Sequence, residues 1–123
     1  MKNFIQEAKK LIDQYHSSEH RVGAVLRSKD GTLFKGVSVQ GQKLNLCSEW
    51  AAMTQALMAG AEIDLAVAVF KSVEGEYKIF APCGICRELY ISYFPNAKVI
   101  ISDTEAVEAV SLLPHAWIKK SGT

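Results

Sequence analysis

The segment that decides the fold reads RVGAVLRSKDGTLFKGVSV and spans residues 21–39. Residues 21–27 form a short apolar run that is typical of a buried strand. Asp30-Gly31 follows, and an Asp-Gly pair between two such runs indicates a hairpin turn. Residues 32–39 are then expected to form the returning strand. The sequence therefore predicts an antiparallel pair of strands in the first third of the chain.

On either side of this pair the apolar pattern changes from a strand period to a helix period. Upstream, residues 3–16 are predicted to form an amphipathic helix. Its apolar face comprises Phe4, Ile5, Ala8, Leu11, Ile12 and Tyr15. Downstream, residues 47–59 have the length and apolar content of a buried helix, and Gly60 is a natural C-terminal stop. A third strand is expected at residues 65–70.

The last third of the chain continues the alternation of strands and helices. Residues 77–81 are expected to belong to a further element, and Pro82 suits the first turn of a helix running to about Phe94. Residues 97–101 are predicted to form another strand, followed by a short helix and a tail. The order α-β-β-α-β-α-β-α predicts an α/β fold with helices on both sides of one mixed sheet.

Composition and length place limits on the class of protein. A chain of 123 residues with no repeat or Pro/Gly/Ser-rich linker is expected to form one domain, residues 1–123. A formal net charge of +1 and the lack of a Lys/Arg-rich run argue against a nucleic-acid partner. The sequence has no 18-residue apolar stretch and no signal-peptide pattern, so we expect a cytoplasmic protein without membrane contact. Three cysteines in a reducing compartment indicate metal ligands or redox groups before disulfides.

Two short segments carry the candidate chemistry, and each lies where a loop becomes a helix. The first is Cys47-Ser48-Glu49, with Asn45 a possible cap, and the second is Pro82-Cys83-Gly84-Ile85-Cys86. A catalytic zinc ion takes three protein ligands and keeps a fourth position open for water. The three cysteines supply that number, and Glu49 is close enough to the first of them to reach the open position.

The protein is expected to offset the net negative charge of such a site. Three thiolates and Zn²⁺ sum to −1, which disfavours ionising a bound water, so something must offset the thiolates. Helix N-termini beside the sulfurs do so, because each behaves as about half a positive charge. Glu49 can then take the water proton and hand protons on to a ring nitrogen and to departing ammonia.

The spacing Cys-x-Glu, followed about 33 residues later by Pro-Cys-x-x-Cys, resembles the signature of the cytidine deaminase superfamily. Weaker likenesses to small tetrameric cytidine deaminases and blasticidin S deaminase occur in the same order at residues 21–26, 30–31, 34–39 and 112–114. The resemblance covers residues 18–117. It implies a three-layer α/β/α sandwich with a five-stranded mixed sheet, one Zn²⁺ per subunit, and a homotetramer whose active sites lie near subunit interfaces.

Several positions depart from the family pattern, and most of them face the substrate in the family. Where cytidine deaminases carry Asn-x-Glu to hold the ribose hydroxyls, this chain has Ser38-Val39-Gln40. His20 replaces a phenylalanine of the pocket wall. Trp50 stands where the tetrameric enzymes carry an arginine that softens the thiolate charge, and Arg87 is a candidate substitute.

The candidate substrate-binding residues are Ser38, Gln40, Ser48, His20 and Trp117. A surface-polar role for Ser38 and Gln40, and a loop position for His20, remain open alternatives. Trp117 either closes a neighbouring subunit's pocket, as the family's C-terminal aromatic residues do, or covers apolar surface. Trp50 is expected in the core or at a subunit interface.

Other readings of the cysteines must be weighed against the catalytic one. A structural zinc site needs a fourth ligand, for which only His16, His20 and His115 are available, none with finger-like spacing. A redox pair would leave Cys47 and Glu49 unexplained, and inert buried cysteines would leave the joint spacing unexplained.

The sequence therefore predicts a zinc-dependent hydrolytic deaminase that acts on a cytosine-like or related amino-heterocycle other than standard cytidine. The alternatives are a true cytidine or deoxycytidine deaminase of pyrimidine salvage, and a non-catalytic relative that keeps the fold and the zinc. Editing of a base in RNA or DNA is disfavoured by the nearly neutral charge. Glu49 favours an enzyme, since a binding module has no need of a proton carrier.

Overall fold

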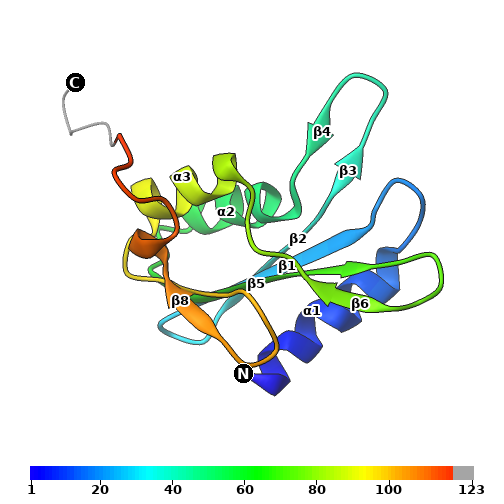
Figure 1. Cartoon of the computed structure of the whole chain (residues 1–123), viewed down its shortest axis with the longest axis horizontal. Helices are drawn as coiled ribbons and strands as arrows, with labels where there is room; N and C mark the ends of the chain where they lie inside the picture. Colours follow the sequence, from blue (N-terminus) through cyan, green and yellow to red (C-terminus); the bar gives the residue numbers. More distant parts are fainter. Residues whose placement is uncertain (118–123) are drawn as a thin grey trace.

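A computed structural model describes residues 1–117 of the chain, which form three layers with a mixed sheet in the middle (Figure 1). Helix α1 (Lys2–Tyr15) covers one face, and helices α2 (Ser48–Met58) and α3 (Gly84–Tyr93) cover the other. Among the described residues, no helix is both long and apolar enough to cross a membrane.

The main sheet has the strand order β2-β1-β5-β7-β8, with β6 paired to the side of β5. Its strands are β1 (Val22–Ser28), β2 (Leu33–Val37), β5 (Ile63–Lys71), β6 (Tyr77–Ile79), β7 (Lys98–Ile100) and β8 (Ala106–Glu108). Only the β5–β7 pairing is parallel, so the sheet is mixed as expected. The α/β/α class is confirmed. The expected number of five strands is present side by side in the sheet, and the short strand β6 is a sixth.

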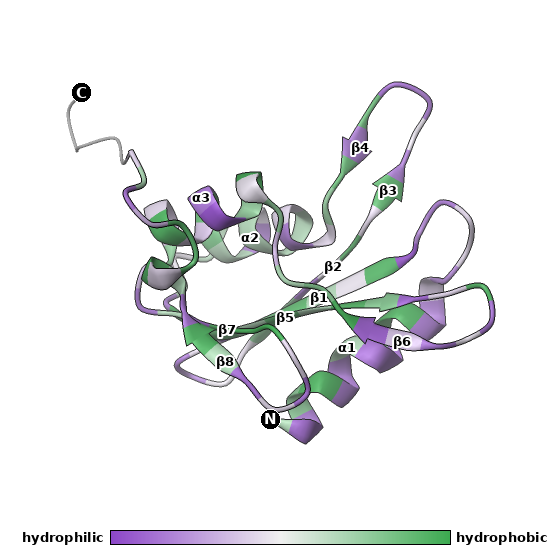
Figure 2. Cartoon of the chain, in the orientation of Figure 1, coloured by the Kyte–Doolittle hydropathy of each residue, from purple (hydrophilic) through white to green (hydrophobic). Residues whose placement is uncertain are grey.

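The core consists of two apolar clusters because neighbouring strand residues point to opposite faces. Val25 and Val67 pack against the apolar face of α1, whereas Leu26 and Ala66 pack under α2 and α3. Figure 2 shows hydrophobic and hydrophilic residues alternating along α1, as the helix period predicts. The sheet is thereby fixed from both sides.

The predicted hairpin is present, with Gly31 at a φ of 92° in the turn between β1 and β2. The second strand, however, leaves the main sheet earlier than expected. It ends at Val37, and the chain continues as a separate hairpin of β3 (Val39–Gln40) and β4 (Asn45–Leu46). The Ser38 hydroxyl oxygen accepts hydrogen bonds from the backbone N–H groups of Arg21 and Val22, which anchors the chain where it diverges.

Two further expectations need correction. Pro82 does not lie in the first turn of α3 but precedes its N-cap, Cys83. In residues 102–117, the described part of the C-terminal segment, the chain forms strand β8 and one 3₁₀ turn (Ala109–Ser111) where a short helix was expected; the end of the expected tail lies outside the described residues. Alternating Glu, Ala and Val favour a helix locally, but pairing with β7 places residues 106–108 in the sheet.

Candidate metal centre and substrate pocket

The two cysteine segments meet because α2 and α3 begin beside the same cavity. Cys47 is the N-cap of α2 and Cys83 the N-cap of α3, both with extended backbone, and Cys86 lies in the first turn of α3. Cys83 comes shortly after β6, where the chain leaves β5. The last hydrogen bond to β5 before Cys83 runs from the Phe80 N–H to the Ala68 carbonyl oxygen, at 2.9 Å. Both helix N-termini therefore contribute positive ends next to the thiols.

The three sulfurs are close enough to share one metal ion. All three Sγ atoms lie within 4.8 Å of one another, and those of Cys47 and Cys83 are 3.9 Å apart. Tetrahedral zinc with bonds of about 2.3 Å would hold its sulfur ligands about 3.8 Å apart. The spacing and the thiol chemistry thus fit zinc. Within residues 1–117 this group contains no fourth ligand, which leaves a position for water.

None of the three histidines considered for a structural site, His16, His20 and His115, belongs to the sulfur group, and two of them make other contacts. The His16 ring Nε2 lies 2.9 Å from the Lys71 carbonyl oxygen, and the His20 ring Nδ1 lies 2.9 Å from the Ser38 carbonyl oxygen. The geometry therefore favours the three-ligand type of site over a closed structural one.

Electrostatics also favour a cation at the sulfurs. Burial raises the pKa of the Cys86 thiol, and burial together with the neighbouring Cys83 raises the pKa of Cys47. Burial also acts to raise the pKa of Cys83, but the backbone N–H of Cys86 and hydrogen bonds with both other thiols outweigh it and lower this pKa. Three thiolates at this spacing need a positive charge among them to ionise together.

Glu49 lies in the first turn of α2 with only 7% of its surface exposed. Burial raises the pKa of its carboxyl to about 7, and the hydroxyl of the fully buried Tyr90 acts more weakly in the opposite direction. Tyr90 Oη makes no hydrogen bond within the described residues but lies near enough to this carboxyl to act on its pKa. A carboxyl with this pKa can accept and release protons near neutral pH.

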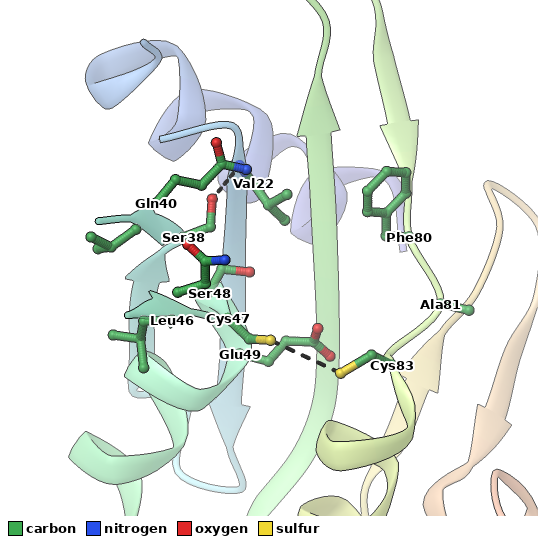
Figure 3. Close-up of a pocket in the computed structure, with 12 residues that line it drawn as sticks. Val22, Ser38, Gln40, Leu46, Cys47, Ser48, Glu49, Phe80, Ala81 and Cys83 are labelled. Atoms are coloured by element: carbon green, nitrogen blue, oxygen red, sulfur yellow. Dashed lines mark hydrogen bonds between the residues drawn. The ribbon is translucent and has the colours of Figure 1, made fainter. Parts of the chain in front are cut away.

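A cavity of about 260 Å³ opens beside these groups (Figure 3). Its lining consists of Val22, Ser38, Val39, Gln40, Asn45, Leu46, Cys47, Ser48, Glu49, Phe80, Ala81 and Cys83. Figure 3 shows Glu49 near the sulfurs of Cys47 and Cys83, with Ser38 and Gln40 on one side and Phe80 on the other. No lysine, arginine or histidine is among the described residues that line it.

The candidate substrate-binding residues occupy different places. Ser38, Gln40 and Ser48 line the cavity, Ser48 being buried and Gln40 exposed at its mouth. His20 is not part of the lining; it supports the start of the β3–β4 hairpin through its contact with Ser38. Trp117 is 75% exposed at the end of the described chain and also lies outside the lining. Substrate contacts of these residues stay predictions.

Two lining residues were not singled out as substrate contacts from the sequence. Asn45, considered as a helix cap, belongs to β4 and pairs with Gln40 across the hairpin, so both amides line the cavity. Phe80 enters from the loop after β6. The sequence shows only that an aromatic residue precedes Ala81-Pro82-Cys83. The direction of the Phe80 side chain depends on the β5–β6 pairing.

Three thiols that can share a metal ion, a buried carboxyl and an adjoining cavity are the arrangement expected of a zinc-dependent hydrolase. Comparison with known proteins gives the family. The model of the cytidine and deoxycytidylate deaminase zinc-binding region matches residues 1–102. The chain belongs to this family, and it is accordingly an enzyme with zinc as cofactor.

Relatives of known activity are of two kinds. Over 99 residues the chain is 31% identical to blasticidin-S deaminase of Bacillus cereus, covering 75% of this chain and 71% of that one. Over 107 residues it is 29% identical to cytidine deaminase of Halalkalibacterium halodurans, covering 81% and 79%. Family membership therefore leaves the substrate open.

Solved structures show the same fold. The cytidine deaminase from Bacillus anthracis superposes with a TM-score of 0.83 at 22% identity, covering 94% of this chain and 88% of that one. The cytidine deaminase from Burkholderia pseudomallei gives a TM-score of 0.76 at 28% identity, covering 94% and 97%.

Proposed function

We propose that this protein hydrolyses the exocyclic amino group of a cytosine-like or related amino-heterocyclic small molecule and releases ammonia. The observation that carries the proposal is the buried Glu49 carboxyl, which shares one cavity with Cys47 and Cys83. A zinc-binding module without catalysis, the second possibility raised by the sequence, has no use for a buried carboxyl of raised pKa at this place.

Each residue of the site has a separate task in this proposal. Cys47, Cys83 and Cys86 hold one zinc ion per subunit, which when bound acts as a Lewis acid and lowers the pKa of a coordinated water. Glu49 accepts a proton as water adds to the amino-bearing carbon and passes a proton to the adjacent ring nitrogen. It then takes the proton of the newly bonded hydroxyl group and delivers it to the departing amine, so the C–N bond breaks, ammonia leaves and a ring carbonyl remains. One carboxyl serves as base and then as acid.

The lining of the cavity supports a substrate without a phosphate group. A phosphate group in this cavity would have no lysine, arginine or histidine from the lining to neutralise it. Ser38 offers only its O–H proton, because its oxygen already accepts two backbone hydrogen bonds. Gln40 offers a neutral amide in place of a carboxylate. We therefore propose an amino-heterocycle other than standard cytidine, with blasticidin S among the candidates; cytidine or deoxycytidine of pyrimidine salvage is the alternative.

We also propose an oligomeric state and a cellular location for this protein. We expect a homotetramer, or at least a dimer, with the cavity near a subunit interface and Trp117 available to a neighbouring subunit. Free thiols that must stay reduced to bind zinc favour the cytoplasm. The proposed partners are small-molecule substrates, and neither nucleic acid nor a membrane is among them.

The test is a screen of the purified zinc-loaded protein for ammonia release from cytidine, deoxycytidine, deoxycytidylate, cytosine, blasticidin S and other amino-heterocycles. We expect the highest kcat/KM for a compound without a phosphate group other than cytidine, a lower kcat/KM for cytidine, and the lowest for deoxycytidylate. The Ser38→Asn/Gln40→Glu double variant should improve cytidine turnover by about tenfold, since a charged acceptor adds roughly 1–2 kcal/mol to a hydrogen bond.

Three outcomes would contradict the proposal at different levels. Ammonia release from none of the compounds would favour the non-catalytic alternative. Cytidine as the best substrate, with no gain in the double variant, would make the chain a cytidine deaminase with an unusual ribose pocket. Equal turnover of deoxycytidylate would contradict a substrate without a phosphate group. Gln42→Glu, in the exposed turn of the same hairpin and outside the lining, is the matched control.

A further inference from the structure

Phe80 is an aromatic side chain that the fold holds in the wall of the cavity. It lines the cavity and keeps 38% of its surface exposed, which leaves a large part of an apolar ring open. Its backbone is fixed at the edge of β5 by the hydrogen bond from its N–H to the Ala68 carbonyl oxygen. The ring is therefore attached to the sheet and not to a free loop.

A second aromatic ring determines how the Phe80 ring is oriented. Phe70, near the C-terminal end of β5, stacks on Phe80 with ring centroids 5.0 Å apart and only 7° between the planes. Phe70 is also the cross-strand partner of Val22, another lining residue, so the two side chains share one face of the sheet. One face of Phe80 is thus covered by Phe70, and the other is available to a ligand.

The position of this ring matches the needs of a flat ligand. Phe80 is the single aromatic residue among the described residues that line the cavity. Figure 3 places it across β5 from Ser38 and Gln40, with Glu49 and the sulfurs of Cys47 and Cys83 at one end of the space between them. Aromatic rings prefer offset parallel stacking, and a ring already held in place loses little freedom when a ligand binds.

We propose that Phe80, supported by Phe70, is the platform on which the substrate's aromatic ring stacks, so that it selects flat heterocycles and places their amino-bearing carbon at the Glu49 end of the cavity. The inference deepens the proposed function and rests on it for the identity of the reaction. It concerns binding, however, and can be tested with ligands that the enzyme cannot turn over.

The experiment uses the zinc-loaded protein with uracil, a flat ring without an amino group, and with 5,6-dihydrouracil, its counterpart with a saturated C5–C6 bond and the same polar groups. Binding is followed by ligand-observed NMR, which reports both affinity and ring-current shifts of the ligand protons. We expect tighter binding of the flat ring, with its protons shifted upfield. Phe80→Leu keeps apolar volume but should weaken this binding about tenfold and remove the shift. Phe80→Tyr should retain both.

Tyr93→Leu is the matched control, because Tyr93 is an aromatic residue with 56% exposure that does not line the cavity. Equal binding of the flat and saturated rings, or an unchanged upfield shift in Phe80→Leu, would overturn the platform. The platform would also be overturned if the main change in Phe80→Leu were a lower molecular mass in sedimentation, since Phe80 would then contribute to a contact between subunits. Any of these results can coexist with ammonia release by the wild type, and absence of ammonia release would count against the proposed function alone.

Discussion

Cys47, Cys83 and Cys86 would place three negative charges around one divalent ion, and the surroundings must offset the excess. The structure provides two helix N-termini for this purpose, since α2 and α3 both begin at cysteines. That Arg87, which directly follows Cys86, also softens the thiolate charge stays a prediction, since neutral carbonyl partners leave its positive charge in place. Its guanidinium donates hydrogen bonds to the carbonyl oxygens of Pro82 and Leu112, at 2.7 and 3.0 Å. Arg87 thus anchors the Cys83 loop to the C-terminal segment.

At the scale of single residues, the ligand assignment predicts what happens when one sulfur is removed. Cys47→Ala should lose most of the zinc found in wild type, about one ion per chain, because two thiolates cannot replace the three-ligand site. Thr54→Ala, an exposed position on the same helix, should keep the full amount. Metal analysis after dialysis measures both. Full zinc in Cys47→Ala would remove Cys47 from the ligand set.

At the scale of elements, the site depends on how closely α2 lies against the edge strand β2. Gly36 in β2 makes this approach possible, because a Cβ at that position would collide with the Ser48 carbonyl oxygen and would lie 2.7 Å from the Ala52 nitrogen. Those atoms belong to the helix backbone and cannot move aside by a rotamer change. The strand thereby positions the first turn of α2, which carries Ser48 and Glu49.

Gly36→Ala should therefore destabilise the fold by about 3 kcal/mol and lower the Tm by about 10 °C or more. Gly84→Ala is the control: Gly84 has no atom within 4 Å of a built Cβ and begins α3 between two ligands. Its Tm should stay within a few degrees of wild type. Calorimetry at one protein concentration decides between them. Equal Tm values for both variants would mean that α2 can move away from β2 freely.

The elements also show how far sequence reasoning reached. The β1–β2 hairpin and the three main helices were predictable, because their turn residues and apolar periods are local signals. Strand β8 was not, since residues 106–108 favour a helix locally and become a strand only through β7. The meeting of Cys47 with Cys83 followed from a motif, whereas the place of Phe80 in the cavity depends on strand pairing.

At the scale of the whole molecule, large apolar side chains remain on the surface of the single chain. Trp50 is 42% exposed on α2, and Trp117 is 75% exposed beyond the last 3₁₀ turn. Exposed tryptophans of this size are typical of surfaces that pack against another copy. Sedimentation at micromolar concentration should therefore give a tetramer, or at least a dimer, of the 13.5 kDa chain. A particle of 13.5 kDa would refute an obligate assembly.

The proposed mechanism requires that this chain is a zinc-dependent deaminase whose protons are carried by Glu49. The most direct test measures ammonia release and zinc content on the same preparations of wild type and Glu49→Gln, with the best compound from the screen. Because an amide cannot accept the water proton, Glu49→Gln should keep about one zinc per chain and lose activity by about 10²–10⁴-fold or more. Ammonia release within about tenfold of wild type, with zinc retained, would contradict the role of Glu49 and with it the mechanism.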